Sequence, residues 1–280
     1  MPYWRRWAGS RCLMSGSVLL EVLGYTAHVT LCHAGKFNAM SRVMWGELRA
    51  VFEDLQKSSP GAVRCVVLQG ANGHFCAGGD ISEYENFRFE EASLRDFHEK
   101  DVWGALQAML DCDVPTLASI DGHCMGAGVE MASCCDLRLA SAAARFGAPI
   151  ARLGFPMAPR EAALLVRVVG EMTAREMLLG AAVLDAAEMK QRGFLSRVCQ
   201  ASALAKDVHD ASKRICNLAP AAARQNKRTF RSNQSLATGF VDRHAMYSVA
   251  GSTADDYQYA DSAEHREGVT AFIEKRAPIF

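Results

Sequence analysis

Two glycine-rich segments contain the groups best suited to hold a developing negative charge. Residues 75–81 follow a short apolar stretch that is typical of a buried strand, and residues 121–130 follow a second such stretch and then open a helix. Small residues at positions 77–79 let a ligand approach the main chain closely. An amide in the first turn of a helix has no partner within the helix and lies at the positive end of its dipole. The two segments together therefore predict a site where backbone N–H groups stabilise an oxyanion.

Glu130 lies one helical turn inside the second segment, where its carboxyl group could transfer protons. The alternative is an acid that caps or ion-pairs the first turn of its helix. The context of the two loops favours the catalytic interpretation. His123, in the same loop, is expected to be structural or solvated. The loop is not a dinucleotide-binding fingerprint, because Met131 stands where the third glycine would be.

Strand-like and helix-like stretches alternate around these loops, which predicts an α/β fold with largely parallel strands. Strands are expected at residues 18–22, 28–31, 63–68, 116–120 and 137–140, and helices at 41–55, 90–111 and 126–135. After residue 160 the strand pattern fades, and helices are expected at 160–169, 173–179, 186–192, 203–217, 221–236 and 263–276. We expect a core over residues 15–200 and a C-terminal helical region over residues 201–280.

Composition limits the class of partner. Lys plus Arg and Asp plus Glu both number 31, so no overall basic field would attract nucleic acid. No apolar run approaches the roughly 20 residues of a membrane helix. None of the 10 cysteines stands in C-x-x-C spacing, which favours buried reduced thiols in a cytoplasmic protein and no metal site. Residues 1–14 are expected to be a disordered extension, with Met14 as an alternative start.

Several motifs in order along the chain resemble those of the enoyl-CoA hydratase (crotonase) superfamily. They are residues 75–81, residues 122–136, Phe146-Gly147 and Leu153-Gly154. Residues 36–40 resemble the family's early CoA-side motif, and residues 267–276 resemble its C-terminal signature. The match runs from about residue 18 to 276. It implies a spiral of β-β-α units and a C-terminal helical region that packs into homotrimers or homohexamers.

The resemblance assigns roles to particular residues. It implies an oxyanion hole made by the amides of Gly79 and Ala127, with an acyl-CoA thioester as substrate and no separate cofactor, since coenzyme A belongs to the substrate. Alanine at 127 keeps the N–H that relatives supply from glycine. The implied contacts with CoA or substrate are Lys36, Ala39, Ala77, Asp80, Ile81, Ser82, Phe272 and Lys275. The last two match residues that in relatives reach CoA held by a neighbouring subunit.

One position departs from the family pattern. Hydratases of the family use two glutamates, and the first corresponds to Glu130. An ungapped match of Phe146-Gly147 and Leu153-Gly154 places the second at Ile150, which is aliphatic. None of its near neighbours is an acid, and one of them, Arg152, is a cation. Arg152 and Arg160 remain candidates to face the acyl pocket and hold a substrate carboxylate.

The leading hypothesis is an acyl-CoA lyase of the enoyl-CoA hydratase type. In this hypothesis the amides of Gly79 and Ala127 bind the thioester oxygen, and Glu130 handles water and proton transfer. The rivals on the same fold are a CoA-ester decarboxylase, a hydrolase and an isomerase. A rival of another class is a homologue that binds acyl-CoA without catalysis. The loss of an acid at Ile150 leaves these rivals open.

Overall fold

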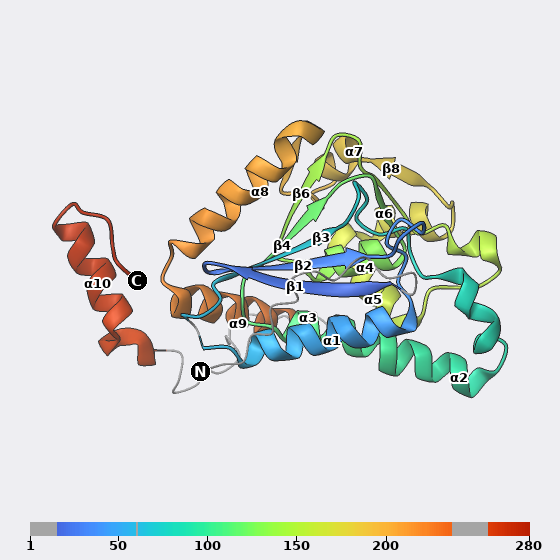
Figure 1. Cartoon of the computed structure of the whole chain (residues 1–280), viewed down its shortest axis with the longest axis horizontal. Coiled ribbons are helices and arrows are strands. Elements are labelled where there is room, and N and C mark those ends of the chain that lie inside the picture. Colours follow the sequence, from blue (N-terminus) through green and yellow to red (C-terminus); the bar gives the residue numbers. More distant parts are fainter. Residues whose placement is uncertain (1–15, 60, 237–256) are drawn as a thin grey trace.

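The computed structural model describes residues 16–59, 61–236 and 257–280, and a six-stranded sheet forms its centre (Figure 1). The strand order is β1-β2-β3-β4-β6-β9. The strands are β1 (Ser17–Leu23), β2 (Thr26–Cys32), β3 (Cys65–Gly70), β4 (Thr116–Ile120), β6 (Leu137–Ser141) and β9 (Arg197–Cys199). Only the β1–β2 pair is antiparallel, and the other neighbours in this sheet are parallel.

The middle strands are buried on both faces, which explains their continuous apolar sequences. Successive side chains of a strand point to opposite faces. In β3, Val66 and Leu68 join the large core, whereas Cys65 and Val67 pack in a smaller cluster with Leu204 and other residues of α8 (Ala201–Cys216). Figure 1 shows α8 on one side of the sheet, with α1 (Arg42–Lys57) and α3 (Trp103–Asp111) on the other.

A second, three-stranded sheet lies at the carboxyl ends of the central strands and carries the site loops. It consists of β5 (His123–Met125), β7 (Arg145–Gly147) and β8 (Val183–Asp185), in that order. Isolated bridges tie the first loop into this region, because Met40 pairs with Gly79 and Cys76 pairs with Cys124. Both glycine-rich segments are therefore fixed at the same end of the molecule.

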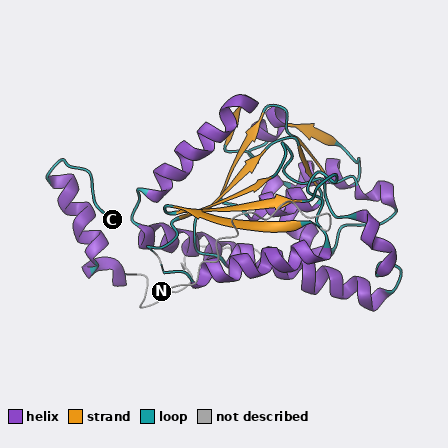
Figure 2. Ribbon diagram, in the orientation of Figure 1, coloured by secondary structure: helices purple, strands orange, loops and turns teal. Residues whose placement is uncertain are grey.

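Helices cover the two sheets (Figure 2). The remaining α-helices are α2 (Glu91–Asp96), α4 (Ala127–Cys134), α5 (Pro159–Val169), α6 (Glu171–Leu178), α7 (Ala186–Gln191), α9 (Pro220–Leu236) and α10 (Ala263–Ile273). A π-helical turn, Phe97–Val102, separates α2 from α3. Short 3-10 turns lie at Ile81–Asn86, Ile150–Leu153 and Gln258–Asp261.

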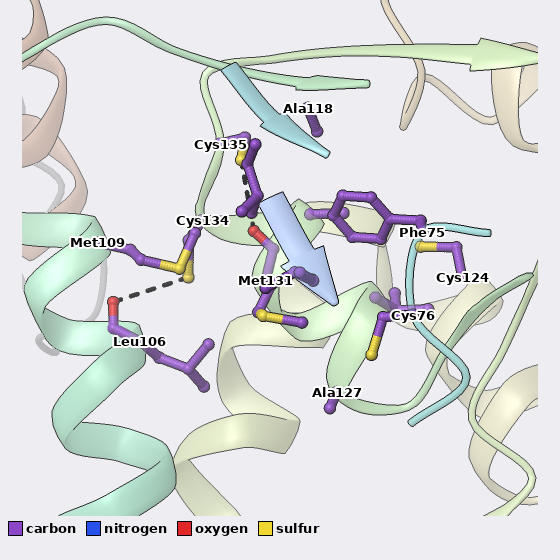
Figure 3. Packing of buried hydrophobic residues seen from close by; sticks show 14 of the residues in the cluster. Phe75, Cys76, Leu106, Met109, Ala118, Cys124, Ala127, Met131, Cys134 and Cys135 are labelled. Atoms are coloured by element: carbon purple, nitrogen blue, oxygen red, sulfur yellow. Dashed lines mark hydrogen bonds between the residues drawn. The ribbon is translucent and has the colours of Figure 1, made fainter. Parts of the chain in front are cut away.

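Helix α4 lies inside the core, and all eight of its residues are buried. Figure 3 shows Met131 and Cys134 of this helix, and Cys135 directly after it, in the same buried cluster as Leu106 and Met109 of α3. The thiol of Cys134 donates to the carbonyl of Leu106, and that of Cys135 to the carbonyl of Met131. Packing on every side holds α4, and with it Glu130, in one position.

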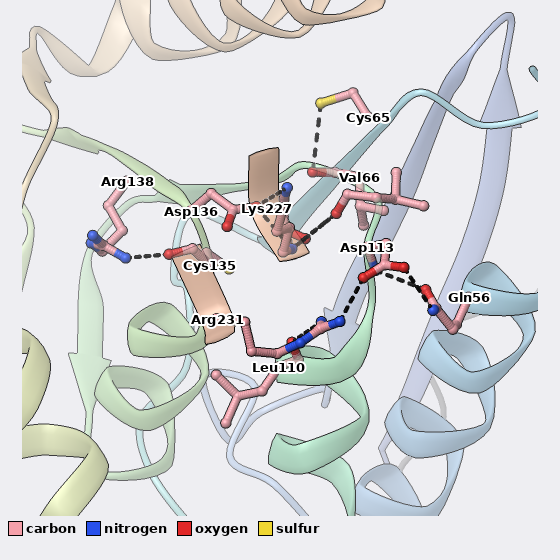
Figure 4. Close-up of polar contacts among 12 residues, drawn as sticks. Gln56, Cys65, Val66, Leu110, Asp113, Cys135, Asp136, Arg138, Lys227 and Arg231 are labelled. Carbon is pink, nitrogen blue, oxygen red and sulfur yellow. Dashed lines mark hydrogen bonds and ion pairs between the residues drawn. The ribbon is translucent and has the colours of Figure 1, made fainter. Parts of the chain in front are cut away.

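Ion pairs attach α9 to the core (Figure 4). Lys227 Nζ lies 2.8 Å from Asp136 Oδ2 and donates to the carbonyl of Val114. Arg231 Nη2 lies 2.8 Å from Asp113 Oδ1. Asp136 also accepts a hydrogen bond from the backbone amide of Thr116. These contacts give Asp136 a structural role.

The sequence prediction of a mixed α/β fold with C-terminal helices is confirmed, whereas one predicted helix differs and four short strands were missed. The expected helix at 90–111 is interrupted by the π-helical turn. Strands β5, β7, β8 and β9 were not predicted; each has three residues, too few to display a period. The division at residue 200 stays a prediction, and residues 1–14 lie outside the described part of the chain.

Other expectations concern what the chain contains. Eight cysteines are free thiols, and seven of them are buried, whereas Cys32 is disulfide-bonded. The expectation of reduced thiols therefore holds for those eight and not for Cys32. No helix in the described ranges is long and apolar enough to cross a membrane. The same residues include no cluster of three or more His, Cys, Asp or Glu side chains suited to a metal ion.

Candidate active site

The first site loop leaves a single backbone amide available. Ala77 N donates to the carbonyl of Phe37, and Gly78 N to the thiol of Cys76. On either side of Gly79, Met40 N donates to the carbonyl of Gly78 and Asp80 N donates to the carbonyl of Met40. Among the described residues the amide of Gly79 has no partner. Gly79 lines the cavity described below, and the oxyanion role of its amide stays a prediction.

The second loop provides the other amide at the start of α4. Gly126 adopts a positive φ of 48°, which glycine tolerates best, and its N–H donates to the carbonyl of Gly147 at 2.8 Å. This turn begins the helix at Ala127, and no side chain caps it. The amide of Ala127 therefore has no intrahelical acceptor.

Close packing of the two loops depends on small residues. A Cβ atom added to Gly128 would lie 2.8 Å from the carbonyl oxygen of Cys76, and one added to Gly126 would lie 3.7 Å from the Cα of Gly78. Met125 N also donates to the carbonyl of Cys76. The amides of Gly79 and Ala127 thus belong to loops in direct contact and can address one oxygen atom.

A cavity of about 310 Å³ lies against these amides and is mostly apolar. Trp45, Ile81, Tyr84, Met125, Phe155 and Met157 supply much of its apolar wall. The titratable groups on it are Tyr84, Arg88, His98, Glu130, Arg152 and Glu161. A largely apolar site of this kind strengthens the interactions of the few polar groups it contains.

Glu130 lines this cavity from α4, and only 5% of the residue is exposed. Burial raises the pKa of its carboxyl group well above the ordinary value, and the nearby charge of Glu161 raises it further. Within the described residues no side chain hydrogen bonds to the carboxyl group. Glu130 is therefore suited to retain its proton to a higher pH than an exposed glutamate and to deliver it inside the cavity.

The sequence prediction missed a second carboxyl group in this cavity. Glu161 lies in the first turn of α5, and its Oε1 is 2.7 Å from Nδ1 of His98. Both side chains line the cavity. The sequence did contain one signal for Glu161. This acid lies on the same helical face as Leu164 and Leu165, where an apolar residue is expected.

The residue at the expected second-acid position does line the cavity. Ile150 lies in the turn Ile150–Leu153 and gives the wall an aliphatic side chain. Arg152 lies on the wall too and donates to the carbonyl of Ala181. Arg160 is not on the wall, because it pairs with Glu99 and lies over the Trp103 ring. The hypothesis that Arg160 holds a substrate carboxylate is not supported.

The predicted CoA-side residues at the N-terminal motif lie together. Lys36 Nζ lies 2.6 Å from Asp80 Oδ2 and 2.7 Å from Ser82 Oγ. Burial alone would raise the pKa of Asp80, but hydrogen bonds from Lys36 and Ser82 outweigh it and keep the pKa below the ordinary value. Ala77 and Ile81 line the cavity, and Ala39 is buried next to the Met40–Gly79 bridge.

Three other predicted residues lie outside the cavity wall. Phe272 belongs to α10 and is 86% exposed, and Lys275 follows the end of that helix. The contact of these two residues with CoA of a neighbouring subunit stays a prediction. His123 lies 2.8 Å from His74 through their Nδ1 atoms and does not face the cavity.

Comparisons with known proteins relate this arrangement to characterised folds. Residues 25–280 match the family model described as enoyl-CoA hydratase/isomerase. The chain is 30% identical over 268 residues to the "Probable enoyl-CoA hydratase echA8" of Mycobacterium tuberculosis, which covers 94% of this chain and 97% of the relative. It is 28% identical over 245 residues to the 2,3-dehydroadipyl-CoA hydratase of Escherichia coli, which covers 87% of this chain and 88% of the relative.

Solved structures give the same result. The crystal structure of an enoyl-CoA hydratase/carnithine racemase from Magnetospirillum magneticum superimposes with a TM-score of 0.84 at 31% identity. That alignment covers 96% of this chain and 97% of the other. AtuE from Pseudomonas aeruginosa superimposes with a TM-score of 0.83 at 29% identity, covering 94% of this chain and 98% of the other.

Proposed function

This chain belongs to the enoyl-CoA hydratase/isomerase (crotonase) superfamily, and we propose that it adds water to an enoyl-CoA thioester. The observation that carries the proposal is the placement of two partnerless amides, Gly79 and Ala127, on the same cavity as the buried acid Glu130. Relatives that are named as hydratases support the choice of reaction.

The amides would act on the thioester carbonyl. Addition of a nucleophile to the β-carbon moves electron density through the α-carbon to the thioester oxygen. Two fixed N–H donors stabilise the resulting enolate oxygen without reorganisation, and the apolar walls of the cavity strengthen that interaction. Glu130, which holds a proton because of its burial, delivers it to the α-carbon.

The substrate's CoA group would lie towards Lys36, Asp80 and Ser82, and the acyl group would lie in the cavity. Contacts from Phe272 and Lys275 to a neighbouring subunit are part of the proposal, as is a homotrimeric or homohexameric assembly. Exposed apolar side chains on and after α10, including Phe272, Ile273 and Ile279, support burial of this helix in an assembly. Sedimentation of the purified chain measures the assembly directly.

The test is turnover of crotonyl-CoA, compared with a panel of malonyl-type CoA esters. We expect hydration by the native protein and a loss of about 10³-fold or more in kcat for Glu130→Gln, which keeps the size of the side chain and removes its acid. Glu99→Gln, an exposed surface acid, is the matched control and should leave kcat unchanged.

Other outcomes would assign the site to a different reaction. Release of CO₂ from a malonyl-type ester without hydration would identify a decarboxylase, and release of free CoA would identify a hydrolase. Tight binding of acyl-CoA with no turnover of any substrate would contradict the proposal and favour a binding protein.

A further inference from the structure

A carboxylate–imidazole pair lies on the cavity wall where the sequence indicated only one acid. Glu161 Oε1 and His98 Nδ1 are 2.7 Å apart, and their side chains are 6% and 17% exposed. Glu161 lies in the first turn of α5, directly after Pro159 and Arg160. His98 belongs to the π-helical turn, a rare geometry that often occurs at functional sites.

The neighbours of His98 define which nitrogen carries the proton. Arg88 Nη1 lies 3.4 Å from His98 Nε2, and a guanidinium can only donate. His98 Nε2 is therefore the acceptor, and Nδ1 donates its hydrogen to Glu161. Arg88 is itself held between aromatic rings, 3.8 Å from the centre of Phe155 and 4.4 Å from that of Tyr84. The chain of contacts from Arg88 through His98 directs the Nδ1–H of His98 at a carboxyl oxygen of Glu161.

Glu130 and Glu161 come from helices that pack against each other, α4 and α5. Both carboxyl groups line the cavity, and two carboxyl groups in such an environment retain one proton between them more readily than they ionise together. Glu161 accepts a hydrogen bond from His98, whereas Glu130 has no donor side chain within the described residues. The two environments therefore separate an acid from a base.

We propose that Glu161, positioned by His98, is the second acid–base group of this site and performs the task that the aliphatic Ile150 cannot. This inference rests on the proposed hydration and adds a residue to it. Purely structural ion pairs are also common, but this one is oriented towards the cavity that contains the oxyanion amides and Glu130. The charged and titratable groups that share the wall with it are Tyr84, Arg88, Glu130 and Arg152.

The step balances with these two groups alone. The Glu161 carboxylate takes one proton from a water molecule, and the water oxygen forms a bond to the β-carbon. The electrons of the carbon–carbon double bond move to the α-carbon and thioester, and the charge on oxygen is held by the amides of Gly79 and Ala127. The proton of Glu130 then bonds to the α-carbon. Glu161 ends protonated and Glu130 ionised, and transfer of one proton from Glu161 to Glu130 restores the starting state.

The experiment separates two reactions that need different groups. Hydration of crotonyl-CoA needs both acids, whereas exchange of the α-protons of butyryl-CoA in D₂O needs only the amides and Glu130 in its ionised form, which takes the α-proton and returns a deuteron. We expect Glu161→Gln to lower kcat for hydration by about 10²- to 10³-fold, with KM changed less than about threefold. Exchange should stay within about tenfold of the native rate, and Glu130→Gln should abolish both reactions.

Three results would overturn the inference while leaving the proposed function intact. They are native-like hydration by Glu161→Gln, a rise in KM at constant kcat, and a parallel loss of hydration and exchange. Failure of the native protein to catalyse either reaction would instead overturn the proposed function, and this inference with it.

Variants of His98 test its positioning role without altering either acid. The side-chain amide nitrogen of asparagine can take the place of Nδ1, so His98→Asn should keep kcat within about threefold of native. His98→Leu removes the donor and should lower kcat at least tenfold with little change in KM. Equal losses in the two variants would assign His98 to packing and count against the proposal. The two His98 variants also test the proposal if Glu161→Gln does not fold. Thermal denaturation would detect such a failure to fold.

Discussion

The reactive groups on the cavity wall are of two kinds: amides of the main chain, here called the amide side, and the acidic side chains with His98, here called the acid side. The amides of Gly79 and Ala127 are positioned by loop geometry, with neighbouring N–H and C=O groups already hydrogen-bonded. The side-chain groups come from three separate segments, because the acids Glu130 and Glu161 are on α4 and α5 and His98 is on the π-helical turn. A backbone donor survives replacement of its side chain, whereas an acid can be lost from one segment and supplied by another.

We expect the amide side to tolerate a change of side chain only where the new side chain displaces no neighbouring atom. Among the variants of the amide side, the largest fall in kcat is expected from Gly79→Ala. Its added Cβ would lie 2.3 Å from the hydroxyl oxygen of Tyr84, whose ring packs against Phe87 and Phe155. Because the ring cannot move freely, we expect displacement of the loop and a fall in kcat of roughly 10- to 100-fold.

A second substitution identifies the cause of that fall. Tyr84→Phe removes the hydroxyl that the new methyl would meet, so Gly79→Ala combined with Tyr84→Phe should recover most of the lost activity, as measured by steady-state hydration. The single variant Tyr84→Phe is the control. No recovery would show that the Gly79 backbone itself had changed.

The acid side should accept a carboxyl group from a different segment. Ile150→Glu, placed in a Glu161→Gln background, puts an acid on the same cavity wall and should raise kcat for hydration about tenfold. Ile150→Gln in the same background matches its size without the acid and should give no gain. Equal rates for the two double variants would mean that position 150 cannot reach the reacting water.

Burial of Glu130 also predicts a difference in stability with pH. Its pKa is raised in the folded state, so the folded protein retains a proton that the unfolded chain releases above about pH 4.5. Native stability should therefore decline, relative to Glu130→Gln, by about 1.4 kcal/mol per pH unit above pH 4.5 until the raised pKa is passed. Denaturant unfolding of both proteins at several pH values measures this slope.

The control for this stability prediction is Glu85→Gln, at an exposed acid in the turn Ile81–Asn86. Its stability curve should run parallel to that of the native protein. If the stability curve of Glu130→Gln also ran parallel to that of the native protein, Glu130 would be ionised in the folded state.

The smallest effect is expected from Ala127→Gly. The amide and the start of α4 remain, and only a methyl group is removed, so kcat should stay within about threefold of native. A glycine in a helix costs up to about 1 kcal/mol, which thermal unfolding would register. A loss of activity above tenfold would show that the methyl group helps to orient the substrate, and the contrast between the two sides would then be weaker.

Local sequence patterns predicted the amide side well and the acid side only in part. Each glycine-rich turn lies between a strand and a helix and is a continuous stretch of sequence, so a site at Gly79, Ala127 and Glu130 could be proposed from the chain alone; the roles of these residues stay predictions. Glu161 could not be found from the motif, because it lies 11 residues beyond Ile150, on the next helix. His98 depends on a π-helical turn that breaks an otherwise regular helical pattern, and no residue type marks such a turn.

The short strands were missed for a related reason. Strands β5, β7, β8 and β9 have three residues each, and their pairing depends on contacts with distant segments. The long, doubly buried strands β3 and β4 are apolar almost throughout and were found. Prediction succeeded for elements whose apolar pattern extends along the chain. It failed for elements that form only when distant segments pair.

The unequal burial of the two acid-bearing helices has a consequence for how the reaction could change. Every residue of α4 is enclosed, so a substitution there disturbs packing on all sides. The first turn of α5 has one buried residue, Glu161, with Pro159 and Arg160 exposed beside it. Exchange of the single side chain at Glu161 therefore disturbs fewer buried neighbours in its own helix turn than an exchange on α4, which makes this turn a natural starting point for laboratory evolution of the site.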